Sequence, residues 1–266
     1  MQYFSRQVPF LLAMAGTALL LMGAGGQVKT RVTSSMDSNI TGSMVTSATC
    51  SMSSSVKSGV TASVTSRPTG TPVTLSPYAE ELARIIKFDR QILIIVKEET
   101  QDRIGRLIGY DEKDYQIIAP GIVVSVPEEK TDRILASLRQ KLRHFKYLPF
   151  VVEMNEGLKV DRIGILKTTD QYEILRVMHT DGDDYGISNQ DVIERLKEWE
   201  EYTPFDIIGA DNDWVEIEFK GMPRDLKAFA AEVYDFCPDA IDQGPGSVEG
   251  LIKDIKRTQR LFLWWD

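Results

Sequence analysis

A sharp change in composition near residue 76 constrains this sequence most, because only the part after it can build a hydrophobic core. Of the 50 residues from 27 to 76, 23 are Ser or Thr and none is aromatic. So little apolar surface cannot offset the conformational entropy that folding removes. We therefore predict a disordered linker over residues 27–76, with the folded elements after it.

The first 26 residues have the layout of a signal peptide or membrane anchor. Arg6 precedes an uncharged apolar run over residues 8–22, and small residues follow up to Gly26. A secretory signal peptide has this order, and the 19 uncharged residues from 8 to 26 also suffice for an uncleaved anchor. Both alternatives predict an exported protein, periplasmic, secreted or anchored, whose membrane contact is confined to this segment. If this N-terminus is foreign to the domain, the protein is cytoplasmic.

Charge is distributed unevenly along the chain. The formal net charge is -8, and residues 1–76 hold five basic side chains against one acidic one, so residues 77–266 carry -12. This charge repels phosphate backbones and argues against a nucleic-acid partner. It favours rapid association with a basic protein instead.

Apolar periodicity from Pro77 onward predicts interleaved helices and strands in an N-terminal α/β part, residues 77–160. The expected elements are a helix carrying Leu82, Ile85 and Ile86, a buried strand at 92–96, two short strands within 114–126 broken at Pro120-Gly121, a helix over 128–142 and a strand at 147–152.

Residues 161–266 are expected to form a C-terminal α+β domain with the order β-α-α-β-β-α-α-β. Omitting one helix from each crossover leaves β-α-β-β-α-β, the ferredoxin-like split β-α-β arrangement. We therefore predict an α+β fold with an antiparallel or mixed sheet and helices on one face. In the strand at 214–219, Glu216 and Glu218 share the face opposite the apolar side chains, so that face is expected to be wet.

Motifs that carry chemistry are sparse. The sequence has no GxxxxGK[ST], GxSxG, HExxH or CxxC pattern, which argues against nucleotide chemistry and zinc hydrolysis. Cys237 ends a predicted helix between Asp235 and Asp239, an environment that raises a thiol pKa, so we expect a buried structural cysteine. We assign no catalytic residue, metal ligand or cofactor.

The acidic loop after residue 178 is the nearest approach to a cation site. Asp181 and Asp183 occupy the first and third positions of a calcium loop, but Val192 stands where the bidentate carboxylate is needed. A solvated acidic loop that enters a helix through Ser188 is favoured over a partial cation site. A base-and-orienter pair of His179 and Asp181 is a further alternative.

Four C-terminal motifs occur in order: Trp199, Phe-Cys-Pro-Asp at 236–239, Gln-Gly at 243–244 and Trp-Trp-Asp at 264–266. Together they resemble the bacterial domain-of-unknown-function family 4253, over roughly residues 163 to 266. The resemblance implies a bacterial protein and brings no established activity, cofactor or catalytic residue.

These motif residues can be interpreted as a latch that closes the core or as an aromatic groove with convergent polar groups. The groove interpretation predicts the binding residues Trp199, Asp239, Gln243, Trp265 and Asp266.

The acidity of the folded part leads us to expect a non-enzymatic binding or interaction module, of the immunity-protein kind, that neutralises a basic protein partner. The alternative is an enzyme of unassigned chemistry that uses the C-terminal Asp/Trp/Gln groove, which requires a carboxyl group with a raised pKa. Whether the chain is an enzyme stays open at this point, with the non-enzyme preferred.

Overall fold

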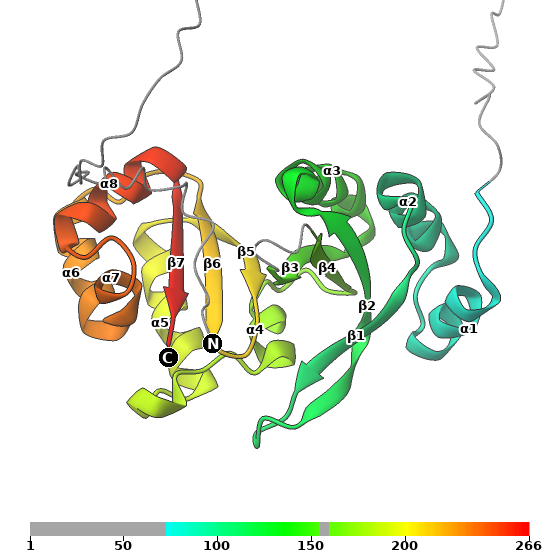
Figure 1. Ribbon diagram of the computed structural model, residues 1–266, viewed down its shortest axis with the longest axis horizontal. Coiled ribbons are helices and arrows are strands. Elements are labelled where there is room, and N and C mark those ends of the chain that lie inside the picture. Colours follow the sequence, from blue (N-terminus) through cyan, green and yellow to red (C-terminus); the bar gives the residue numbers. More distant parts are fainter. Residues whose placement is uncertain (1–72, 155–159, 266) are drawn as a thin grey trace, which may run out of the picture. The chain divides into compact units, whose positions relative to one another are not determined.

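The computed structural model describes residues 73–154 and 160–265 (Figure 1). Three predicted parts of the chain lie outside these ranges: the signal segment, the linker except for residues 73–76, and the binding residue Asp266. No helix within them is both long and apolar enough to span a bilayer. The helices are α1 (Pro77–Ile86), α2 (Arg90–Thr100), α3 (Thr131–Leu142), α4 (Tyr172–Met178), α5 (Asn189–Tyr202), α6 (Leu226–Phe236), α7 (Asp239–Asp242) and α8 (Val248–Thr258).

One mixed sheet runs through the described residues and confirms the α+β class. Its strands are β1 (Gly105–Tyr110), β2 (Gln116–Pro127), β3 (Leu148–Glu153), β4 (Val160–Leu166), β5 (Phe205–Ala210), β6 (Trp214–Phe219) and β7 (Arg260–Trp264). They lie in the order β1-β2-β4-β3-β5-β6-β7. Neighbours are antiparallel except β3 and β5, which are parallel.

The strand order corrects the ferredoxin-like expectation. β3 lies between β4 and β5, whereas β5, β6 and β7 are antiparallel neighbours in chain order. The prediction failed because it omitted one helix from each crossover. A single helix returns the chain to the end where the preceding strand began, so the next strand is parallel. A second helix, as in α4–α5, brings the chain back again and makes β4 and β5 antiparallel.

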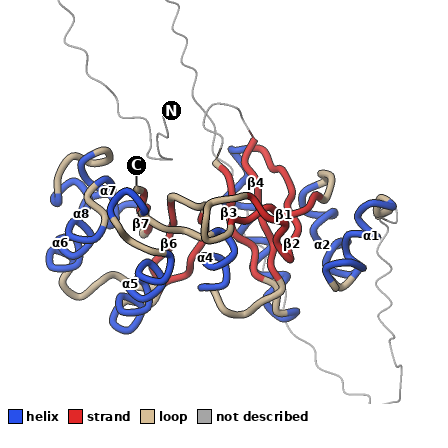
Figure 2. Tube along the Cα trace, turned by 90° about the horizontal axis from the view of Figure 1, so that it is seen from below, coloured by secondary structure: helices blue, strands red, loops and turns tan. Residues whose placement is uncertain are grey.

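Helices cover both faces of the sheet, so the expectation of helices on one face is wrong. Along β3, Phe150 belongs to one buried cluster and Val151 to the other, and Ile207 and Ile208 of β5 divide in the same way. Because successive strand side chains point to opposite faces, these are two separate cores. One core contains residues of α4 to α8 and the other contains residues of α1 to α3. In Figure 2, α5 to α8 lie toward one end of the sheet and α1 and α2 toward the other.

The N-terminal part differs from its prediction in two places. Residues 92–96 belong to helix α2, because Ile92, Leu93 and Val96 bury one helical face, and a short apolar run does not distinguish helix from strand by itself. The strand β2 continues through Pro120-Gly121 and pairs with β1, which was not predicted. The pairing shifts register here, because Arg106 and Ile108 of β1 face Ile122 and Ile118 of β2, so the extra residues around Pro120-Gly121 lie in β2.

Local signals in the C-terminal part predicted its elements well. Ser188 caps α5, accepting a hydrogen bond from the Asp191 backbone N–H, and the Asp191 side chain completes a capping box. The hairpin of β5 and β6 turns at residues 211–213, as expected.

Candidate functional site

The two predicted tryptophans meet through a shared aromatic neighbour inside the core. Trp199 is 1% exposed and Trp265 is 4% exposed. The Phe236 ring lies edge-on to both, with centroid distances of 5.8 Å to Trp199 and 5.7 Å to Trp265. Both indole rings therefore contribute to packing, and Trp265 also contacts the loop at Gly182, where an added Cβ would lie 2.8 Å from its ring.

The predicted polar residues lie in different surroundings. Asp239 is 6% exposed and accepts a hydrogen bond of 2.6 Å from the Tyr185 hydroxyl. This hydrogen bond, more than burial, raises the pKa of Tyr185 to about 12. Gln243 is exposed after α7. The structure thus brings Asp239 to the loop before α5 and leaves Gln243 at the surface.

Cys237 is a buried structural thiol, as predicted. Its Sγ donates a hydrogen bond of 3.0 Å to the carbonyl of Trp264, and burial raises its pKa to about 12. A thiol that stays protonated at neutral pH is a poor nucleophile. Cys237 therefore joins α6 to β7 and carries no reactivity.

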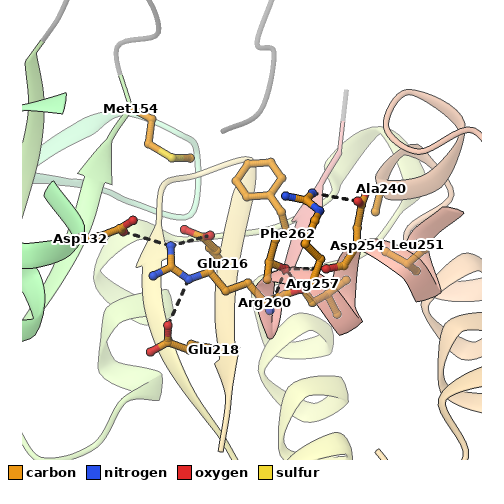
Figure 3. Close-up of a pocket in the computed structure, with 12 residues that line it drawn as sticks. Asp132, Met154, Glu216, Glu218, Ala240, Leu251, Asp254, Arg257, Arg260 and Phe262 are labelled. Atoms are coloured by element: carbon orange, nitrogen blue, oxygen red, sulfur yellow. Dashed lines mark hydrogen bonds and ion pairs between the residues drawn. The ribbon is translucent and has the colours of Figure 1, made fainter. Parts of the chain in front are cut away.

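An acidic cleft of about 360 Å³ lies where the beginning of β7 meets α8, β6 and the N-terminal end of α3 (Figure 3). We define the acidic cleft by the charged side chains that line it: Asp132, Glu216, Glu218, Asp254, Arg257 and Arg260. None of these residues was predicted from the sequence as a site residue.

Arg260 stands at the centre of the acidic cleft and joins three carboxylates. Its Nη1 lies 3.1 Å from Asp132 Oδ1 and 3.6 Å from Glu216 Oε1, and its Nε donates to Glu218 Oε1 at 3.1 Å (Figure 3). Burial opposes the charge of this guanidinium, but the surrounding carboxylates outweigh it and raise the pKa of Arg260. The arginine stays charged and holds β6, β7 and α3 together.

The face of β6 that carries the two glutamates is only partly wet, which corrects the prediction. Glu216 is 6% exposed, because Phe262 pairs with it from β7 and Arg260 reaches over the same face. Glu218, two residues further along β6 on the same face, keeps 47% of its side-chain surface exposed. The cleft therefore has a buried carboxylate at its floor and an exposed one at its rim.

A second cluster of charged groups forms where the turn between β1 and β2 meets the loop after α4. We call Asp114, His179 and Asp181 the junction cluster; one ligand atom from each lies within 4.8 Å of the others. The structure thus brings together the predicted pair His179 and Asp181, with Nε2 and Oδ2 3.6 Å apart, but does not include Asp183. These three side chains are the group within the described residues that could hold a metal ion.

Asp114 and Arg260 were not predicted from the sequence, for the same reason. Asp114 lies 65 residues before His179, and Arg260 lies 128 residues after its partner Asp132. Two weak signals were present: an acidic turn between apolar strands, and a basic residue at the start of the last strand. Neither signal indicates a partner that far away along the chain.

Comparison with known proteins gives one family match. Residues 162–266 match the family described as Domain of unknown function (DUF4253). The matched range contains β5 to β7, α4 to α8 and all the predicted binding residues. No curated protein and no solved structure matches the chain.

Proposed function

We propose that this chain, which carries a DUF4253 domain at residues 162–266, is a binding module that docks a basic protein partner in its acidic cleft. The observation that carries the proposal is the charge inside the cleft, where four carboxylates and two guanidinium groups surround one cavity (Figure 3). Two carboxylates are thus in excess. Such a cavity favours a cationic side chain from outside the chain.

The internal arginine indicates which side chain the cleft would accept. Asp132 and Glu218 already bond a guanidinium from one side and keep 61% and 47% of their side-chain surfaces exposed. Each carboxylate oxygen pair can accept more than one charge-assisted hydrogen bond. A partner arginine entering the cavity would therefore find acceptors already held in position.

Charge outside the cleft acts in the same direction. Of the -12 carried by residues 77–266, the cleft accounts for -2, and the remaining -10 would accelerate encounter with a basic partner and slow encounter with an acidic one. Immunity-type neutralisation of a basic protein is the specific role that we attach to this proposal. Bacterial origin and export through the apolar run at residues 8–22 belong to it as well.

The test measures binding of the full chain to a fluorescent arginine-rich peptide, with a glutamine-substituted peptide as the neutral probe. The cleft variant combines Asp132→Asn with Glu218→Gln. The matched control combines Glu98→Gln in α2 with Asp235→Asn in α6, two exposed acidic residues outside the cleft. Titrations are done at ionic strengths of about 0.01 M and about 0.15 M, where charges are screened over about 30 and 8 Å.

We expect the cleft variant to lose at least about tenfold in affinity, equivalent to about 1.4 kcal/mol, while the control changes by less than about threefold. Affinity should also fall steeply with salt. Equal losses in the two variants would mean that only net charge matters and would refute the acidic cleft as the docking site. Saturable binding of the neutral probe with the same affinity would refute a cationic partner.

A further inference from the structure

We propose that the junction cluster binds a divalent transition-metal ion such as Zn²⁺, through one imidazole nitrogen and two carboxylate oxygens. The ligand atoms of Asp114, His179 and Asp181 lie within 4.8 Å of one another. Two ligands of a tetrahedral zinc ion, each bonded at about 2.0 to 2.2 Å, lie about 3.3 to 3.6 Å apart. His179 Nε2 and Asp181 Oδ2 are already at this spacing, 3.6 Å apart. A movement of up to about 1.5 Å, which the exposed Asp114 side chain can supply by rotation, brings the third ligand to the same spacing.

The charge balance of the cluster points to a cation. Neither Asp114 nor Asp181 forms an ion pair with a lysine or arginine within the described residues, and the basic group paired with Asp181 is the His179 imidazole. In the acidic cleft, by contrast, Arg260 forms ion pairs with three of the carboxylates. A divalent ion would compensate negative charge that no lysine or arginine pairs with here.

The loops that carry the ligands are held in place by other groups. The Asn212 side chain donates to Asp114 Oδ1 at 3.0 Å, and the Asn212 carbonyl accepts from the Asp181 backbone N–H at 2.8 Å. The Thr180 hydroxyl donates to the Asp211 carbonyl at 2.7 Å. The turn of the β5–β6 hairpin therefore connects two ligand loops, so a metal ion would enter a site that is already assembled.

The mixture of ligand atoms selects the class of metal. Ca²⁺ and Mg²⁺ prefer oxygen ligands, and Ca²⁺ takes six to eight of them. Imidazole nitrogen suits zinc and the neighbouring transition metals. Three protein ligands also leave at least one coordination position for water. We therefore expect Zn²⁺ to bind and Ca²⁺ to compete weakly.

The experiment titrates the untagged full chain with ZnCl₂ by isothermal titration calorimetry. Cys50→Ser is present in every protein, because a thiol is itself a zinc ligand. The variants are Asp114→Asn, His179→Asn and Asp181→Asn. The control is Asp184→Asn, an exposed carboxylate of the same loop outside the cluster. Asparagine tolerates the left-handed backbone of Asp114 and His179, whose φ values are 57° and 50°.

We expect one equivalent of Zn²⁺ to bind, at least about a tenfold loss of affinity in each of the three variants, and no change in the control. The absence of saturable binding would overturn the proposal. So would zinc binding that all three variants retain, or that the control loses equally.

Thermal melting separates a metal site from a merely structural cluster. Without metal, Asp181→Asn should melt above the parent protein, because it removes one of two facing negative charges. With saturating Zn²⁺ the order should reverse, because only the parent gains the binding free energy. If Asp181→Asn melts below the parent with and without zinc by the same margin, Asp181 is structural and the proposal fails.

Discussion

At the scale of single residues, burial displaces the pKa of the Asp211 carboxyl group strongly from its ordinary value. Burial, opposed by a backbone hydrogen bond at Asn212 and supported by the charge of Asp213, raises the pKa of Asp211 to about 7. Its Oδ1 is buried and accepts no hydrogen bond from the described residues. Charging this group in the folded state therefore costs free energy that the unfolded chain does not incur.

This shift predicts how the free energy of unfolding depends on pH. Between the ordinary value of 3.8 and about 7, the folded state holds a proton that the unfolded state has released. Stability should therefore fall as pH rises through this window, by up to about 1.4 kcal/mol per pH unit from this group. Asp211→Asn should remove this fall and be more stable than the parent at pH 7.

Urea unfolding at several pH values between about 4 and 8 measures the effect. Asp235→Asn, which alters an exposed acidic residue of α6, serves as the control and should keep the slope of the parent. A parallel pH profile for Asp211→Asn and the parent would show that Asp211 is ionised throughout this range.

At the scale of elements, the β1–β2 hairpin packs against the C-terminal part through a close approach of β1 to α4. A Cβ placed on Gly109 would lie 2.2 Å from the Val177 carbonyl oxygen. A backbone carbonyl cannot move aside as the end of a flexible side chain can. Gly109→Ala should therefore force β1 away from α4. We expect a loss of about 1 to 3 kcal/mol in the free energy of unfolding, as for other overpacked sites.

Denaturant midpoints of Gly109→Ala and Gly221→Ala test this contact, since a Cβ on Gly221 meets no atom within 4 Å. Gly221→Ala should unfold near the midpoint of the parent. Equal midpoints for the two variants would mean that the β1–β2 hairpin does not pack against α4 in solution.

At the scale of the whole molecule, β3 joins the family-matched residues to the rest of the chain. β4 pairs with β2 and β3, and β3 also pairs with β5. A fragment of residues 160–266 therefore keeps β4 without either of its sheet neighbours. Phe150 and Val152 of β3 also lie in the core formed with α4 and α5, so the fragment leaves part of that core open.

We expect the fragment 160–266 to melt well below the fragment 73–266, and with lower cooperativity, in thermal unfolding followed by circular dichroism. Hydrogen exchange should show early loss of protection in β4. A fragment 160–266 that melts cooperatively at the temperature of the longer one would mean that the family-matched residues fold without β3.

The sequence by itself determined the structures that depend on neighbouring residues. Ser188 and Asp191 begin α5, residues 211–213 turn the β5–β6 hairpin, and Cys237 is buried at a helix end. Capping, turn chemistry and periodicity act over a few residues, so they can be recognised in one sequence. The α+β class followed from the same signals.

Only the tertiary structure decided the strand order and the sites. The insertion of β3 between β4 and β5 depends on which sheet edges and faces remain to be covered when the chain returns. The meeting of Asp114 with His179, and of Asp132 with Arg260, depends on that order. The physical reason is that a local pattern specifies which side of an element is apolar, whereas packing of the whole sheet specifies which distant side chains become neighbours.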